Sequence, residues 1–242
     1  MSKISDDIHM GQIVSRQIRL WERTYESGEV SRPEQAVPCI TISKEIGSQG
    51  VELGQRLARR LSWQLYDKEL VEYIAENAKV RRNVVESFDE KTQSEIETWV
   101  RTLVDKHSLS SDKYFKHLMT VILAIAKHGR AVILGRGCNF ILPAFKTLRL
   151  KIISPIEKRV NYIMAQEHVG KSEAAEIVAV ADKQRAAFIR RFFHHDAAEP
   201  LNYDMVLNLG SMTLNMAEKI VMHALQVKFP DFDQVRLSPA GN

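Results

Sequence analysis

The sequence predicts an α/β fold in which a parallel sheet of about five strands is flanked by helices. Short β-branched and apolar runs alternate with longer amphipathic stretches, which is the order that successive βα units produce. A glycine-rich turn follows the first of these runs, and another glycine turn follows a later one. Parallel strands joined by right-handed crossovers bring their carboxyl ends to one edge of the sheet, where ligands bind in such folds.

The expected strands are five runs with the composition of buried β-structure. They are Cys39–Ser43, Trp63–Asp67, Arg130–Gly137, Thr147–Ser154 and Tyr203–Asn208. The first is apolar and β-branched, as a strand covered on both faces should be. After its glycine turn, Leu53, Leu57 and Leu61 recur every four residues, which predicts a helix with one buried face.

An N-terminal arm is expected before the sheet. The stretch Met10–Gly28 places Ile13, Ile18, Leu20 and Trp21 among arginines and glutamates, which is typical of an amphipathic helix. We expect this helix to pack on the main domain or to form a homodimer. The expected boundaries are 1–36 for the arm and its linker, 37–228 for the main domain and 229–242 for a loose tail.

Two helix starts carry capping signals. Ser111 is a suitable N-cap for the helix that follows it. Ser154 is followed by Pro155 and, three residues on, by Glu157, which together predict a capping box with proline at the first helical position.

The composition is that of a globular protein that binds small anionic molecules. The chain has 242 residues, of which 45% are hydrophobic and 26% charged, and 34 Lys and Arg against 30 Asp and Glu give a net charge of +4. This surplus suits phosphate-bearing ligands and is too small to indicate nucleic acid. There is no signal peptide pattern and no apolar run near the roughly 18 residues of a membrane span. Cys39 and Cys138 lack metal-ligand spacing, so we expect reduced thiols and a cytoplasmic protein with no membrane partner.

The stretch SKEIGSQGVELGQ combines a strand end, a glycine turn and a helix start. Such a turn directs backbone N–H groups and the positive end of a helix dipole to one point, which favours phosphate. We expect Gly47 and Gly50 to supply backbone freedom and Ser48 to supply a hydroxyl. A complete phosphate loop would place lysine where Gly50 stands and a hydroxyl near Glu52. An ordinary tight βα turn is the alternative.

Four stretches, taken together, resemble the cytidylate kinase-like family, a divergent branch beside the bacterial cytidylate kinases. They are ITISKEIGSQGVELGQRLARRL, LYDKELVEYIA, VILGRGCNFIL and RAAFIRRFF…YDMVLNLGSMTL. The resemblance implies a P-loop nucleoside monophosphate kinase fold of the P-loop NTPase type, with a helical monophosphate-binding insert at about 69–129 and a lid at about 170–200. It also implies phosphoryl transfer from ATP to CMP or dCMP with Mg²⁺, whose ligands the sequence does not identify.

The resemblance places several residues around the two substrates. Gly47, Ser48, Gln49 and Gly50 fall on the phosphate loop, where they would bind ATP. Asp67 falls on the aspartate of the family's DTG motif near the monophosphate. The same aspartate is equally well explained as the N-cap of the helix that it precedes.

Arginines would supply the remaining contacts to phosphate. Arg136 falls on the arginine of the family's GRD motif, which holds the substrate phosphate, and a structural ion pair is the alternative. Arg185, Arg190 and Arg191 fall in the lid, whose closure would bring them onto the transferring phosphoryl group. They could also form a solvated basic face.

The departures from the family pattern leave two functions open. Typical cytidylate kinases read DGPSGSGKGT and EGRD, whereas here Ser43 and Gly50 replace an aspartate and the lysine, and Leu134 and Gly137 replace two acids. The divergent branch commonly reads SREFGSGG, with a basic residue where Lys44 stands. This pattern predicts a relocated cation, although a surface lysine is the alternative. The chain is therefore either an ATP-dependent nucleoside monophosphate kinase or a catalytically impaired nucleotide-binding regulator.

Overall fold

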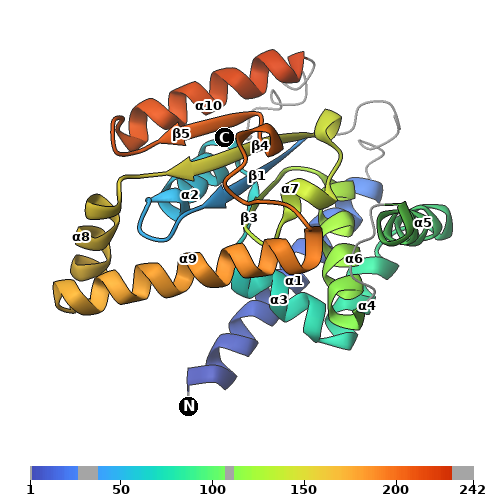
Figure 1. Cartoon of the computed structure of the whole chain (residues 1–242). Coiled ribbons are helices and arrows are strands. Elements are labelled where there is room, and N and C mark those ends of the chain that lie inside the picture. The colour runs from blue at the N-terminus through green and yellow to red at the C-terminus, as the bar shows by residue number, and fades with distance from the viewer. Residues whose placement is uncertain (1, 27–37, 107–111, 231–242) are drawn as a thin grey trace, which may run out of the picture. The chain divides into compact units, whose positions relative to one another are not determined.

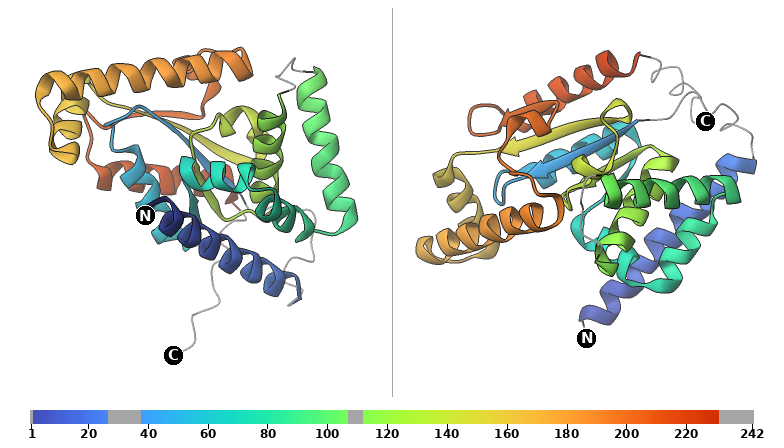
Figure 2. Two further views of the ribbon diagram at one scale, coloured as in Figure 1. Left: turned by 90° about the horizontal axis from the view of Figure 1, so that it is seen from below. Right: turned by 45° about the vertical axis from the view of Figure 1, so that its right-hand side comes forward.

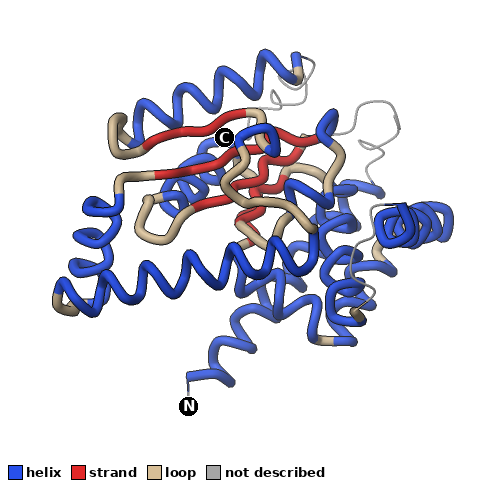
Figure 3. The backbone as a smooth tube through the Cα atoms, in the orientation of Figure 1, coloured by secondary structure: helices blue, strands red, loops and turns tan. Residues whose placement is uncertain are grey.

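The five-stranded α/β fold expected from the sequence is confirmed. A computed structural model describes residues 2–26, 38–106 and 112–230. The chain divides into two compact units: a helical unit of residues 1–36 and 66–129, and a sheet unit of residues 37–65 and 130–242. Figure 3 shows the sheet in red, and its strand order is β2-β3-β1-β4-β5.

The strands end close to where the sequence predicts. They are β1 (Cys39–Lys44), β2 (Gln64–Tyr66), β3 (Ala131–Leu134), β4 (Thr147–Ile153) and β5 (Met205–Asn208). The pairs β1–β3, β1–β4 and β4–β5 are all parallel. In the β1–β4 pair Ser43 lies opposite Lys151 and Lys44 lies opposite Ile152. The carboxyl ends of β1, β3 and β4 therefore meet at one edge, as parallel pairing requires.

Five helices and two short 3₁₀ turns complete the sheet unit. They are α2 (Gly50–Leu61), α7 (Cys138–Ile141), α8 (Ile156–Glu167), α9 (Lys171–Phe193), α10 (Leu214–Lys228), η1 (Ala144–Lys146) and η2 (Pro200–Asn202). Figure 1 shows β4 leading into α8, and α9 returning from it. The two helices pack against each other as a hairpin, which the views in Figure 2 also show.

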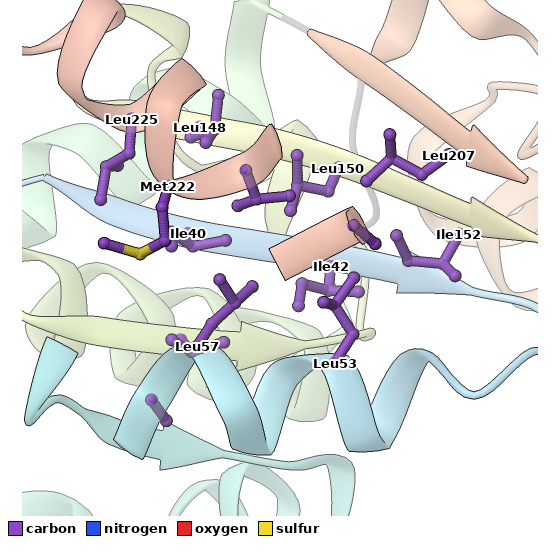
Figure 4. Packing of buried hydrophobic residues seen from close by; sticks show 14 of the residues in the cluster. Ile40, Ile42, Leu53, Leu57, Leu148, Leu150, Ile152, Leu207, Met222 and Leu225 are labelled. Carbon is purple, nitrogen blue, oxygen red and sulfur yellow. The ribbon is translucent and has the colours of Figure 1, made fainter. Parts of the chain in front are cut away.

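The main core lies between the sheet and the helices α2 and α10. Alternate residues of β1 and β4 point into it, and so do leucines of α2 (Figure 4). Ile40, Ile42, Leu57, Leu150 and Ile152 are completely buried there. The leucines spaced by four in α2 are buried as predicted.

Neither cysteine forms a disulfide, as the sequence predicts, and both are buried. Burial raises the pKa of the Cys39 thiol, and likewise that of the Cys138 thiol, to about 12. They therefore behave as small apolar side chains rather than as reactive thiolates.

The helical unit is built from α1 (Ser2–Glu26), α3 (Lys68–Glu76), α4 (Ala78–Glu86), α5 (Glu90–Lys106) and α6 (Lys113–His128). The arm helix α1 begins before the expected Met10 and packs on α3 and α4 through Val14, while Leu20 stays exposed. Gly11 allows close approach, because a Cβ there would lie 3.2 Å from the hydroxyl of Tyr73. The expected linker and most of the expected tail lie outside the described residues. Among the described helices, none has the length and apolar character that crossing a bilayer requires.

The two capping predictions fail in the structure. The N-cap of α6 is Asp112, whose carboxylate accepts from the Phe115 N–H at 3.2 Å, while Ser111 lies outside the described residues. The N-cap of α8 is Pro155, which makes no side-chain cap. The N–H of Ser154 instead donates to the Glu45 carboxylate at 3.2 Å, so this segment is fastened to the loop after β1.

Candidate functional site

The turn between β1 and α2 has the backbone geometry of an anion-binding loop. Gly47 has φ +73°, and a Cβ there would lie 2.6 Å from the Arg159 carbonyl oxygen, so both conformation and space require glycine. Gln49, just before the helix, also has a positive φ of 60°. The first-turn N–H groups of α2 have no acceptor within the helix, and they mark the positive end of its dipole.

Gly50 has a different role from the one expected. It is the first residue of α2 and has no positive φ, so it does not supply backbone freedom. A Cβ at this position would lie 2.7 Å from Cβ and 3.2 Å from Cδ of Lys44. The aliphatic stem of Lys44 therefore occupies the space beside Gly50, where a complete phosphate loop carries its own lysine.

The hydroxyl of Ser48 is committed to the loop itself. It donates to the Glu45 carbonyl at 2.7 Å, and the backbone N–H of Ser48 reaches the same oxygen at 3.3 Å. The side chain is buried. Ser48 thus fixes the shape of the turn. Its hydroxyl does not point to solvent, where we had expected it to contact phosphate.

A buried arginine that the sequence reasoning missed joins this loop to α9. Arg159 of α8 pairs with Asp182 of α9 at 2.8 Å and with Glu45 at 3.5 Å, and it donates to the Ile46 carbonyl at 3.3 Å. It is only 6% exposed. Its two carboxylate partners stay about one-third exposed, so the guanidinium is the part of this network that would be left buried without an acceptor if they were removed.

The three arginines of α9 that were expected in a lid differ in their surroundings. Arg185 pairs with Asp182 at 3.2 Å and is half-buried; desolvation lowers its pKa, and the carboxylates of Asp182 and Glu45 oppose that shift. Arg190 and Arg191 are exposed, and the guanidinium of Arg191 lies 4.9 Å from the centre of the Phe192 ring. Of the three, Arg185 is the one connected to the loop.

Arg136 lies in a turn of unusual backbone conformation directly after β3. Gly135, Arg136 and Gly137 have φ values of 74°, 54° and 64°. A positive φ at arginine is uncommon and costs about 1–3 kcal/mol, and such conformations cluster at ligand sites. Its guanidinium lies 5.1 Å from the centre of the Phe188 ring, and a Cβ at Gly137 would overlap the ring of Phe193. The end of α9 thus packs directly on this turn.

Asp67 belongs to the helical unit, where it caps α3. Its Oδ1 accepts from the Leu70 N–H at 2.9 Å. The N-cap interpretation of Asp67 is therefore confirmed.

The carboxylates near the loop are all engaged, so they do not form a metal site as they stand. Arg159 binds Glu45 and Asp182, and the Tyr162 hydroxyl donates to Glu52. Within residues 2–26, 38–106 and 112–230 there is no group of three or more His, Cys, Asp or Glu arranged to hold an ion. In this arrangement the acids therefore do not fit a resident Mg²⁺.

A family model and a curated protein match parts of this chain. The model of the cytidylate kinase-like family matches residues 39–211, well over half of the chain. The curated protein is a uronate isomerase from Corynebacterium glutamicum, with 33% identity over 111 residues, which make up 46% of this chain and 21% of that protein. The chain thus spans about a fifth of that relative's length.

Solved structures share the fold of the chain. An uncharacterized protein from Eubacterium ventriosum superimposes with a TM-score of 0.61 at 22% identity, covering 78% of this chain and 98% of that one. This likeness shows a common fold. A shikimate kinase from Bacteroides thetaiotaomicron gives a TM-score of 0.43 at 11% identity, over 78% of this chain and 98% of its own, and a likeness at that level carries no argument.

Proposed function

This chain belongs to the cytidylate kinase-like family, and from that premise we propose that it is a nucleoside monophosphate kinase. It would transfer the γ-phosphoryl group of ATP to CMP, dCMP or a related acceptor. The observation that carries the proposal is the packing of the Lys44 stem against Gly50, where an added Cβ would lie 2.7 Å from the Cβ of Lys44. A lysine delivered from the strand end would replace the one that the helix start lacks.

In this proposal the loop and Lys44 hold the ATP phosphates. The N–H groups at the start of α2 would bind phosphate oxygens, with Gly47 and Gln49 shaping the turn around them. Phosphoryl transfer depends mainly on holding the phosphates in line and neutralising the charge that develops on them. An ammonium can do this from β1 as well as from α2, provided that it reaches the same oxygens.

Arg136 is the proposed clamp for the acceptor phosphate. A guanidinium binds phosphate through two parallel hydrogen bonds, and the strained turn holds its backbone in one orientation. Arg185 would complete the charge around the transferring group, with Arg190 and Arg191 joining it on closure of the lid. Asp67 stays a proposed contact to the acceptor, beside its capping role.

One observation favours a second function, nucleotide binding without catalysis. Glu45 and Glu52, the acids nearest to the loop, are held by Arg159 and Tyr162. A protein that binds nucleotide to change conformation needs the loop and no acid. Arg159, which joins the loop to α9, would then transmit occupancy of the loop to the lid.

The two functions separate in a paired measurement on the purified protein. ATP or ADP at millimolar concentration with Mg²⁺ should raise the melting temperature, because a ligand that prefers the folded state stabilises it by mass action. A coupled assay of ADP release across all nucleoside monophosphates then tests for turnover. Absence of any thermal shift would refute the loop assignment, whereas binding without turnover would leave the regulatory function.

Replacing Arg136 tests the acceptor site. We expect Arg136→Ala to raise KM for the monophosphate by about 10- to 100-fold and to change kcat less, because the clamp contacts the phosphate in both ground and transition state. Arg60→Ala, which removes an exposed arginine paired with Glu218, is the control. Equal effects of the two variants on KM would contradict the assignment.

A further inference from the structure

Lys151 is a buried lysine close to the loop, on the face of the sheet opposite α2 and α10. It lies near the carboxyl end of β4 and is 7% exposed. Its register partner on β1 is Ser43, so the two side chains share one face. The next pair, Lys44 and Ile152, points to the other face. The end of β1 therefore has a lysine on either side of the sheet.

A comparison within β4 shows what is unusual about Lys151. Arg149 lies two residues earlier on the same face, and its guanidinium pairs with Asp204 at 2.9 Å. For Lys151 the described part of the chain supplies neither a hydrogen bond nor an ion pair; its recorded contact is with the ring of Tyr203, whose centre lies 5.7 Å from the ammonium. Its ammonium nitrogen is not among the completely buried polar atoms that lack a partner in the described residues, so the charge at the end of this buried side chain is open to solvent or to a ligand.

The charges that face Lys151 do not neutralise it. Desolvation is the largest cause of its lowered pKa, and the nearby Arg185 adds to the effect. Glu45, Asp182 and Asp196 oppose the shift, but arginine side chains already bind the first two, and Asp196 accepts from the Ala198 N–H. Lys151 and Arg185 thus form a pair of neighbouring cations, an arrangement that an anionic ligand would stabilise.

We propose that Lys151 binds the terminal phosphate of a nucleotide held at the loop after β1. This inference rests on the proposed function, since it requires phosphates at that loop. The start of α2 would hold phosphate oxygens from one face of the sheet. A cation from the opposite face would contact the oxygens that point away from α2. In this proposal those oxygens belong to the phosphoryl group that is transferred. Lys44 and Lys151 would then flank the phosphates from the two faces.

The competing role for Lys151 is structural, with the ammonium held in place by the Tyr203 ring. A cation–π contact stabilises the folded protein, and it does so more strongly when the cation is shielded from water. The two roles predict opposite effects of removing the lysine on the stability of the ligand-free protein. A structural lysine stabilises the ligand-free protein, whereas a lysine kept for phosphate destabilises it until the ligand is bound.

The test compares Lys151→Met with Lys183→Met, which removes an exposed lysine of α9. Methionine keeps most of the length and volume of lysine and removes the charge. Melting temperatures are measured without ligand, and dissociation constants for ATP, ADP and AMP by calorimetry, all with Mg²⁺. For Lys151→Met we expect an unchanged or higher melting temperature without ligand. We also expect ATP to bind about 10- to 100-fold more weakly and AMP to bind nearly as in the wild type, because AMP lacks the terminal phosphate.

Each other outcome overturns the inference in a recognisable way. If the wild type binds ATP and Lys151→Met binds it equally well, Lys151 is no phosphate ligand, while the proposed function stands. A lower melting temperature without ligand, or failure of Lys151→Met to fold, assigns the structural role. Equal weakening of ATP and AMP removes the assignment to the terminal phosphate. If the wild type binds no nucleotide, the proposed function fails first and this inference falls with it. Lys151→Arg, which keeps the charge, should retain most of the ATP affinity.

Discussion

The two faces of the β1–β4 pair differ in almost every residue. The face toward α2 and α10 carries apolar side chains that are at most 2% exposed: Ile40, Ile42, Leu148, Leu150 and Ile152. Most of the alternate residues on the opposite face are polar: Thr41, Ser43, Thr147, Arg149 and Lys151, with the apolar Cys39 and Ile153 at the ends of the strands. One pair of strands therefore stabilises the fold on one side and presents polar groups on the other.

The polar face is built at a cost to stability. Among the described residues, the Thr41 hydroxyl and the Nε atom of Arg149 are buried and have no hydrogen-bond partner. Each such group costs about 1–3 kcal/mol or more. Natural proteins depart from good packing mainly at functional sites, so this face is where the chain trades stability for binding.

The largest effect that we expect comes from Lys44, the last residue of β1. If the protein is a kinase, Lys44→Ala should lower kcat by roughly 10³-fold, because the charge that this lysine neutralises grows in the transition state. The ADP-release assay at saturating substrates measures it, with Lys183→Ala as the control for an exposed lysine. A tenfold effect or less would tell against a relocated cation.

Exchanging the two positions sharpens this test. Gly50→Lys alone should reduce folding yield or activity, since its Cβ would lie 2.7 Å from that of Lys44. The exchange variant Lys44→Gly/Gly50→Lys removes that conflict and restores the usual phosphate-loop lysine. Its kcat should exceed that of Lys44→Ala by at least about tenfold. An exchange variant no more active than Lys44→Ala would contradict the view that the two positions are equivalent.

On the apolar face a substitution should change stability and leave binding intact. Leu57 of α2 is completely buried in the main core. Leu57→Ala should lower the free energy of unfolding by about 2–5 kcal/mol, as urea denaturation measures it. The ATP affinity of the folded fraction should stay within about twofold of the wild type. A larger loss of affinity would mean that the two faces are not independent.

The apolar residues of the core and the order of strands and helices along the chain could be predicted from the sequence, because both depend on local patterns. The leucines spaced by four in α2 and the apolar strand Cys39–Ser43 identify themselves by period and composition. Asp67 could be expected as an N-cap for the same reason. The failed caps at Ser111 and Ser154 show the limit of local rules, since the Ser154 N–H is instead bound by Glu45, more than a hundred residues away in the sequence.

The polar face was harder to predict because it depends on pairing across the sheet. The sequence indicated why Gly47 is needed, but it assigned Gly50 to backbone freedom, whereas the contact with Lys44 explains it. The run LRLKII offers a signal for Lys151: a charged residue among apolar ones, two positions from Arg149, in a run expected to be a strand of the sheet. That alternation predicts a strand with one polar face. Arg159 gives no comparable signal, because its partners come from β1's loop and α9.

The smallest expected effect tests the cost of the polar face directly. Thr41 is completely buried, and its hydroxyl has no partner within the described residues. Valine has nearly the same shape without the hydroxyl, so Thr41→Val should raise the free energy of unfolding by about 1 kcal/mol, as measured by urea denaturation. Ile42→Val, one residue away on the apolar face, is the matched control and should lower it by about 0.5–1.5 kcal/mol. The two changes are conservative and adjacent in the sequence. Opposite changes in the free energy of unfolding would therefore show, without any ligand, that the two faces contribute differently to stability. Destabilisation by Thr41→Val would show that the hydroxyl is satisfied in solution and that this residue of the polar face has no cost to stability.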